Sequence, residues 1–311
     1  MIAKFMSNYG LALALLLEVV LFAILSPFFL TAENLLNVTL QISITAIIAA
    51  GMTFVILTGG IDLSVGSLVA VVGIVATIVL KIPDAFPLAI VAALAAGIAF
   101  GAFSGAIAGF FITRFRVTPF IVTLALMTIW RGAAFALTDG RPVWELPEGF
   151  STLANGRVFG IPIPTLCTAA IFLLAHIALT RTVFGRYVLA VGGNAEAARL
   201  AGINTKRIFT SVYVLCGALA GVSGILLASR VNSGQPNAGM MYELDVIAAV
   251  VVGGTSLSGG RGSIVGTLLG SLLIGILRNG LNLQNVDSYV QQIVVGAVIL
   301  LAVMLDQYKK K

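Results

Sequence analysis

The sequence has few charged side chains for its length. Of 311 residues, 10% are charged and 59% are hydrophobic, and the mean hydropathy is +1.09. A soluble domain carries about 25% charged residues, so this chain has too few to cover a surface that faces water. The shortage excludes an ordinary soluble protein and indicates a chain that lies in a lipid bilayer.

Groups that carry catalysis or bind metals are also scarce. The single histidine, His176, has no cysteine or carboxylate at metal-ligand spacing. The two cysteines, Cys167 and Cys216, lie in apolar runs and are expected to be small buried core residues rather than a disulfide or a metal site. No Gly-x-Ser-x-Gly or His-Glu-x-x-His motif occurs. We therefore expect no enzyme activity, no catalytic residue, no metal and no cofactor.

The sequence also lacks the motif that binds nucleotide phosphates. A P-loop needs Gly-Lys followed by Ser or Thr, and none of the six lysines follows a glycine. Any work driven by ATP must therefore come from a partner chain. The net charge is +6, but no basic stripe with interleaved aromatics is present, so nucleic acid is not an expected partner.

The chain has instead a series of apolar runs near the length of a membrane span, about 20 residues. The first is longer than the apolar region of a signal peptide and is expected to stay as a helix. The eighth is short and is expected to be a broken or half helix. The sequence thus predicts an all-α, polytopic membrane protein with a single domain over residues 1–311. The expected spans are 9–30, 38–58, 63–80, 86–113, 117–137, 164–180, 208–228, 244–258, 262–279 and 287–305.

The basic residues divide unequally between the connections of these ten spans. Lys and Arg concentrate on the cytoplasmic side of a membrane. With the N-terminus inside, twelve fall on the inner side and five on the outer side, which favours an even number of spans with both termini in the cytoplasm. The inner set is Lys4, Arg114, Arg116, Arg181, Arg186, Arg199, Lys206, Arg207, Arg261, Lys309, Lys310 and Lys311.

Glycines recur every four residues in three of the spans. Small residues at this spacing let helices approach closely in lipid, where little hydrophobic force acts between them. These stripes predict helix packing rather than a substrate site. Their members are Gly97, Gly101, Gly105 and Gly109, then Gly217 and Gly221, then Gly262, Gly266 and Gly270.

Two glycine-rich segments, 59–67 and 253–260, interrupt apolar runs in the two halves of the chain. Such paired interruptions indicate a transport pathway. Asp62 lies in the first, and a charge within a span costs about 2.5–3.5 kcal/mol, so it usually faces a cavity or a partner. Asp62 would equally suit a helix N-cap at a turn near the membrane surface. Both interpretations stay open, as does the role of Glu18 in the first span.

The connection from Arg181 to Arg207 predicts a short helix over about 195–201. Asn194 suits its N-cap, Glu196 its first turn, Arg199 its last turn and Gly202 its end. A helix of this kind is either a plain connector or a docking element for a cytoplasmic partner. On the opposite side, the long polar stretch 138–164 is expected to cap the pathway or receive an extracytoplasmic protein, with 229–243 sharing that role.

Several of these motifs together resemble one family. The run from Gly51 to Ser67, GMTFVILTGGIDLSVGS, resembles the signature of monosaccharide ABC-transporter permeases of the ribose type. Further stretches agree in order along nearly the whole chain: 185–187 with 192–194, 242–245 leading into 253–257, and 279–306. The resemblance implies the ten-helix importer permease fold in the bacterial inner membrane. It also implies a second permease copy, a periplasmic sugar-binding protein and a separate ATPase with two nucleotide-binding domains.

The same resemblance implies a site for each role. The helix near 195–201 would couple to the ATPase through Gly192, Gly193, Asn194, Glu196, Arg199 and Gly202. The glycine-rich breaks would lie beside the path of the sugar, with Thr58, Gly59, Gly60, Asp62, Ser64, Gly254 and Ser256 as pathway candidates. Ribose is the expected sugar within a group that also carries other monosaccharides. The alternative function is a secondary sugar carrier or channel that needs no ATPase, in which Asp62 and Glu18 would carry protons.

Overall fold

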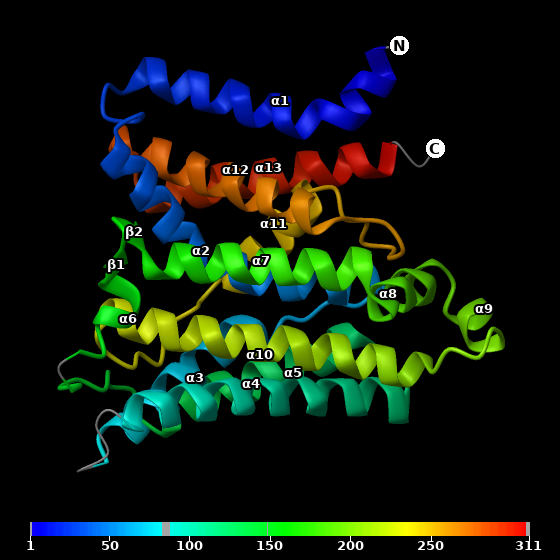
Figure 1. Cartoon of the computed structure of the whole chain (residues 1–311), viewed down its shortest axis with the longest axis horizontal. Coiled ribbons are helices and arrows are strands. Elements are labelled where there is room, and N and C mark those ends of the chain that lie inside the picture. Colours follow the sequence, from blue (N-terminus) through cyan, green and yellow to red (C-terminus); the bar gives the residue numbers. More distant parts are fainter. Residues whose placement is uncertain (1, 83–87, 148, 309–311) are drawn as a thin grey trace.

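The computed structural model describes residues 2–82, 88–147 and 149–308 and shows an almost entirely helical chain (Figure 1). Of the predicted basic residues at the ends, Lys309–Lys311 and the side chain of Lys4 lie outside the described part. The elements are α1 Ile2–Leu25, α2 Ala32–Leu57, α3 Val65–Leu80, α4 Leu88–Phe115, α5 Pro119–Ala136, α6 Thr152–Asn155, β1 Arg157–Val158, β2 Ile161–Pro162, α7 Ile163–Arg181, α8 Val183–Gly193, α9 Ala195–Leu200, α10 Thr205–Val231, α11 Tyr242–Val252, α12 Ile264–Leu283 and α13 Ser288–Tyr308.

Each of the ten predicted spans coincides with one helix. Within the described residues, six helices are long and apolar enough to cross a membrane: α2, α4, α5, α7, α10 and α12. The apolar parts of α1, α3 and α13 are shorter, and α11 has only 11 residues, as expected for the short eighth segment. The all-α polytopic fold is confirmed, and the count of ten crossings stays a prediction.

Two predicted ends were placed too late. The first helix ends at Leu25 rather than near residue 30, because Pro27 disfavours helical backbone in the residue before it. The eighth ends at Val252 rather than near residue 258, because Gly254 takes a left-handed backbone with φ +87°. Both ends follow from local backbone chemistry that the apolar pattern does not reveal.

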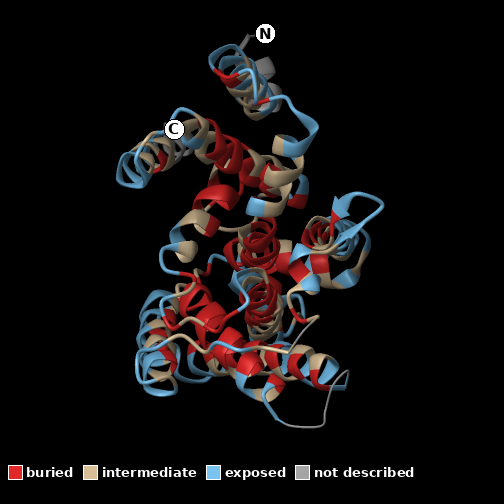
Figure 2. Ribbon diagram, turned by 90° about the vertical axis from the view of Figure 1, so that its left-hand side faces the viewer, coloured by how far each residue is buried: buried red, intermediate tan, exposed pale blue. Residues whose placement is uncertain are grey.

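The core of the bundle lies where α2, α3 and α10 pack together. Residues 46–57 of α2 and 65–74 of α3 are all buried, and Figure 2 shows buried residues concentrated in the central helices with exposed ones at the rim. Large exposed apolar side chains occur on the outer helices, among them Leu17 of α1, Phe103 of α4 and Leu174 of α7. These side chains suit contact with lipid, because lipid tails are as apolar as they are.

The glycine stripes pack helices against each other, which confirms their predicted role. A Cβ atom at Gly101 of α4 would overlap the carbonyl oxygen of Gly217 in α10, and one at Gly217 would overlap the carbonyl oxygen of Gly101. In the same way a Cβ at Gly266 of α12 would overlap the carbonyl oxygen of Gly253 after α11. Backbones this close leave no room for a side chain between them.

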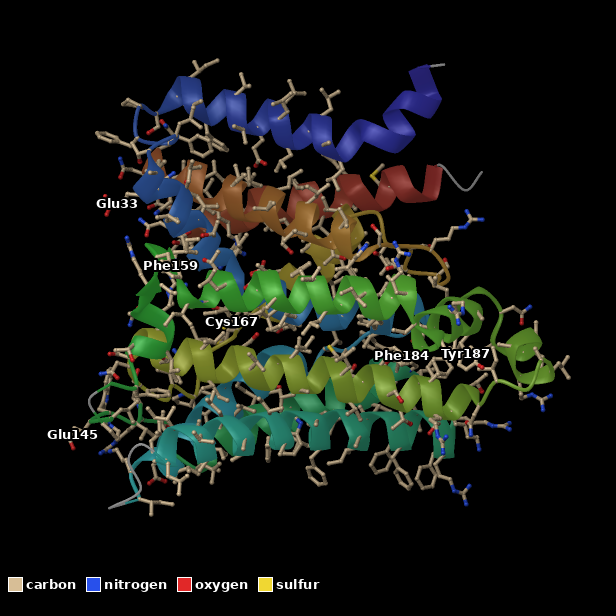
Figure 3. The ribbon with its side chains drawn as sticks, in the orientation of Figure 1. Glu33, Glu145, Phe159, Cys167, Phe184 and Tyr187 are labelled. Atoms are coloured by element: carbon tan, nitrogen blue, oxygen red, sulfur yellow. The ribbon has the colours of Figure 1, made fainter. Side chains whose placement is uncertain are left out.

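The two long polar connections join each other at the end of the bundle that carries β1 and β2. Val143 and Gly234 exchange backbone hydrogen bonds of 2.8 and 3.0 Å, and the Ser229 hydroxyl donates to the Phe150 carbonyl at 2.7 Å. Phe159, fully exposed at the tip of the β1–β2 hairpin, lies at this end (Figure 3). The described residues of the segments 138–164 and 229–243 therefore join in one layer at this end of the bundle.

Candidate coupling element and glycine junction

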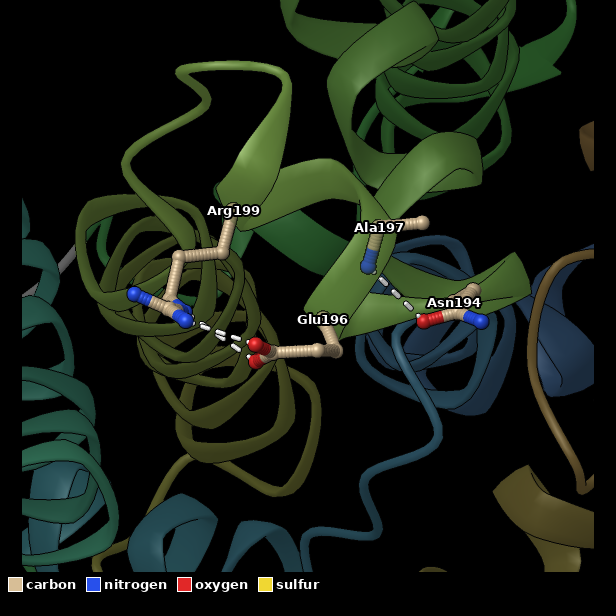
Figure 4. A network of polar contacts seen from close by, with 4 residues as sticks. All are labelled: Asn194, Glu196, Ala197 and Arg199. Atoms are coloured by element: carbon tan, nitrogen blue, oxygen red, sulfur yellow. Dashed lines mark hydrogen bonds and ion pairs between the residues drawn. The ribbon is translucent and has the colours of Figure 1, made fainter.

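The helix predicted over 195–201 is present as α9. The Asn194 side chain accepts a hydrogen bond from the Ala197 amide at 2.9 Å, and this N-cap is visible in Figure 4. Gly202 ends the helix with φ +85°, and its amide donates to the Arg199 carbonyl at 3.0 Å. Figure 1 shows α9 projecting beyond the ends of the neighbouring helices. The boundaries and both capping residues of α9 are confirmed.

Glu196 and Arg199 form an ion pair on the exposed side of α9 (Figure 4). Arg199 donates to the two carboxylate oxygens at 3.0 and 2.6 Å. These hydrogen bonds and the positive charge of Arg199 lower the pKa of Glu196 below its ordinary value. The carboxylate therefore stays charged throughout the neutral pH range, and it faces solvent, where a partner can reach it.

A further helix, α8, precedes α9 and was not predicted from the sequence. Its first residues are capped by Thr182, whose hydroxyl accepts from the Gly185 amide at 3.3 Å. Phe184 stacks on Phe54 of α2 with ring centroids 5.8 Å apart, and Figure 3 shows Phe184 beside the ends of the long helices. The sequence feature that could have predicted this helix is Thr182 as an N-cap, followed by Val188 and Val191 three residues apart. Both valines are buried in the structure.

The first glycine-rich break begins with a sharp helix end. Gly59 has φ +80°, a conformation that glycine adopts without strain. The Gly60 amide donates to the Val55 carbonyl at 3.0 Å and the Gly59 amide to the Ile56 carbonyl at 2.8 Å. This pair of bonds defines a Schellman end for α2. The Thr58 hydroxyl is directed back to its own helix, where it donates to the Val55 carbonyl at 2.8 Å.

Asp62 lies inside this break with only 1% of its surface exposed. Its Oδ1 atom accepts from the amide of Ser64 at 2.9 Å and from the hydroxyl of Ser64 at 2.6 Å. The neighbouring Ile61 carbonyl accepts from Tyr213 and Thr123, each at 3.3 Å. The predicted N-cap role of Asp62 is wrong, because the N-cap of α3 is Ser64. The Asp62 carboxylate instead closes the turn that precedes this cap.

The second break repeats the geometry of the first. The Gly254 amide donates to the Val251 carbonyl at 2.9 Å and the Thr255 amide to the Val250 carbonyl at 3.1 Å, which gives α11 a Schellman end as well. Gly254 therefore matches Gly59, each being the left-handed residue after the helix cap. The Ser256 side chain accepts from the Ser258 amide at 3.3 Å within the break.

The two breaks meet each other and α8 at one point, which we call the glycine junction: Leu57, Gly192, Gly259 and Gly260. The Gly260 amide donates to the Leu57 carbonyl at 2.9 Å. A Cβ at Gly192 would overlap the Leu57 carbonyl oxygen and lie 2.7 Å from the Gly260 nitrogen. Gly193, by contrast, has open space on its Cβ side. The structure thus brings the predicted pathway segments against the predicted coupling segment through close backbone contacts.

Three residues that the sequence singled out lie away from this junction. Cys216 is buried, as expected, but Cys167 is only partly buried, because α7 lies at the rim of the bundle. The Oε2 atom of Glu18 in α1 is buried and has no hydrogen-bond partner within the described residues. The role of Glu18 stays open.

The fold defines the chain as a polytopic, all-α membrane protein. Residues 34–303 match the family described as branched-chain amino acid transport system / permease component, and the chain belongs to this family. It is 48% identical over 98% of its length to ribose import permease protein RbsC of Bacillus subtilis, covering 94% of that protein. It is also 49% identical to RbsC of Escherichia coli K12. The matched region covers 96% of this chain and 93% of that RbsC protein.

A further relative is the L-arabinose transport system permease protein AraH of Escherichia coli K12. It is 40% identical to this chain, over 98% of this chain and 92% of AraH. No solved structure matches the chain. The named relatives are thus sugar permeases, although the family takes its description from amino acid transport.

Proposed function

We propose that this chain is the membrane-spanning subunit of a binding-protein-dependent ABC importer for a monosaccharide, with ribose as the first candidate. Support comes from relatives 48–49% identical that are named ribose import permeases and cover nearly the whole chain. In this function the chain performs no chemistry itself. It provides the path, and a separate ATPase provides the energy.

The observation that carries the proposal is the link between α9 and the two breaks. α9 is exposed and bears a fixed ion pair, whereas α8, immediately before it, is locked to both breaks at the glycine junction. A partner that moves α9 would therefore move the ends of α2 and α11 with it. We assign ATPase coupling to Gly192, Gly193, Asn194, Glu196, Arg199 and Gly202.

In the proposed mechanism the sugar path opens alternately to the two sides of the membrane, because the ends of α2 and α11 move. A loaded binding protein docks on the outer layer of 138–164 and 229–243, where Phe159 and Trp144 are exposed. ATP binding closes the nucleotide domains beneath α9, and this movement displaces the glycine junction. The two glycine-rich segments, 59–67 and 253–260, then move apart and open the path. Thr58, Gly59, Gly60, Asp62, Ser64, Gly254 and Ser256 then act as the inner gate of the sugar path rather than as a high-affinity site.

We further propose that two copies assemble in the bacterial inner membrane with α9 in the cytoplasm. In Figure 1, α1 begins and α13 ends at the same end of the bundle as α8 and α9. That end also carries Arg186, Arg199, Lys206 and Arg207, in accord with the rule that basic residues stay inside. Both termini are then cytoplasmic.

The test is ATPase activity in proteoliposomes that contain this chain, its ATPase and its binding protein. Ribose-loaded binding protein is expected to raise ATP hydrolysis several-fold and to drive ribose uptake, whereas unloaded protein has little effect. If arabinose or leucine stimulated ATP hydrolysis instead of ribose, the importer function would stand and its substrate would be that other solute. If this chain alone moved sugar down a gradient without the ATPase, the carrier function would replace the importer.

A charge exchange on α9 tests docking. The double variant Glu196→Arg, Arg199→Glu keeps an ion pair within α9 but reverses the charges that a partner meets. An exposed pair of this kind contributes little to stability, so thermal unfolding should be nearly unchanged. We expect ribose-stimulated ATPase activity to fall at least tenfold, and Lys206→Gln outside α9 serves as the control. Full activity of the exchanged variant would show that α9 is only a connector.

A further inference from the structure

A polar cavity of about 180 Å³ lies between α2, α10, α11 and α12, away from the glycine junction. We call it the outer cavity, because it is near the end of the bundle opposite α9: Arg230 is in the last turn of α10 and Tyr242 begins α11. The volume is enough for several waters or one small solute. Its polar walls are Gln41, Thr45, Tyr242, Asp245, Ser271 and Arg278.

An ion pair forms the centre of this wall. Arg278 of α12 donates to Asp245 of α11 at 2.6 Å, and the Asp245 side chain is only 12% exposed. The Nε atom of Arg278 is buried and has no hydrogen-bond partner within the described residues. Ionisable groups within a bundle usually mark a substrate path.

The hydroxyls beside this pair are also arranged to serve a ligand. Thr45 donates to the Ile42 carbonyl at 3.1 Å and Ser271 to the Thr267 carbonyl at 2.9 Å. Since each hydroxyl proton is used within its own helix, each oxygen keeps lone pairs that can accept from a donor in the cavity. Tyr242 adds an aromatic ring, and Gln41 adds an amide with both donors and acceptors.

This set of groups suits a small neutral polyol. Neighbouring hydroxyls of a sugar both donate and accept, so they can bind a guanidinium, a carboxylate and side-chain hydroxyls at once. Asp245 and Arg278 neutralise each other, and the ligand needs no charge of its own. A zwitterionic amino acid would instead need a carboxylate free for its ammonium group, and Asp245 is already engaged by Arg278. Arg230, half-exposed at the rim, is the remaining charge at the cavity.

We propose that the outer cavity is a transient binding site for a pentose, which occupies it after leaving the binding protein and before reaching the inner gate. The inference rests on the proposed function and adds the residues that touch the substrate. Binding here is weak, because a sugar held tightly would not move on.

The first experiment measures sugar molecules imported per ATP hydrolysed in the reconstituted complex. Thr45→Val and Ser271→Ala leave the ion pair intact, and together they are expected to lower this ratio about tenfold, since the sugar loses two hydrogen-bond acceptors in the cavity. Asp245→Asn is expected to lower it further. Glu33→Gln is the matched control, because Glu33 is exposed at the start of α2 (Figure 3) and its loss should leave the ratio unchanged.

The second experiment detects occupancy without transport. Thr45→Cys is introduced after Cys167 and Cys216 are replaced by alanine, and its reaction with a small thiol reagent is followed in nanodiscs. Millimolar ribose should slow the reaction several-fold, and leucine should not. If the substitutions left the number of sugars imported per ATP unchanged and ribose did not slow labelling of Thr45→Cys, the proposed pentose site would be wrong. The importer function would not be affected by that result. Protection by leucine alone would overturn both the site and the sugar substrate.

Discussion

Replacing Gly192 by alanine is expected to abolish transport by this chain. The new Cβ would overlap the Leu57 carbonyl oxygen and lie 2.7 Å from the Gly260 nitrogen, and both of these atoms belong to the backbone. Neither can turn aside as a flexible side chain would, so the Leu57–Gly260 hydrogen bond must break. Overpacking typically costs about 1–3 kcal/mol, and loss of a buried backbone hydrogen bond adds to it.

The neighbouring glycine supplies the control for folding and stability in this experiment. Gly193 has open space at its Cβ position, so Gly193→Ala should fold with the thermal stability of the original chain. The measurement is ribose uptake in proteoliposomes beside thermal unfolding of the purified permease. Equal stability and equal uptake of the Gly192→Ala and Gly193→Ala variants would contradict the close contact at the glycine junction. If Gly193→Ala folds normally but loses ATPase stimulation alone, Gly193 touches the partner directly.

The second large effect is expected at the crossing of α4 and α10. Gly101→Ala and Gly217→Ala each place a methyl group on the carbonyl oxygen of the facing glycine. The helices must separate, and the close packing that stabilises them in lipid is lost. We expect each variant to lose about 1–3 kcal/mol or more of folding free energy. The yield of monodisperse protein in detergent, followed over a temperature series, measures this loss.

A glycine outside any contact tests whether the loss is specific. Gly132 in α5 has nothing within 4 Å of its Cβ position, so Gly132→Ala should keep or slightly raise stability, since alanine favours helix by about 1 kcal/mol. Similar stabilities for Gly101→Ala and Gly132→Ala would show that α4 and α10 are not in the contact described.

The sequence alone located the ten apolar helices and α9, and its errors lie at helix ends and in the missed α8. Apolar runs are a local property and predicted a helix at all ten positions, including the short α11. The caps of α9 were also readable, because Asn194 and Gly202 act on backbone within a few residues of themselves. The end of α11 at Val252 was missed although Gly253 and Gly254 follow it, because a glycine alone does not show where a helix stops, and the stop is set by the left-handed backbone of Gly254. α8 was missed because its amphipathic pattern is short.

What the sequence determined by itself is therefore a membrane-embedded, all-α chain with glycine-packed helices and a capped helix at its basic side. Only the tertiary structure decided which distant segments meet. Leu57 and Gly260 are about two hundred residues apart in the sequence. Neither has a local sequence feature that predicts its contact with the other. Asp245 and Arg278 likewise became the wall of one cavity only when α11 packed against α12. The physical reason is that helix formation depends on neighbours in sequence, whereas contacts between helices depend on how whole surfaces fit.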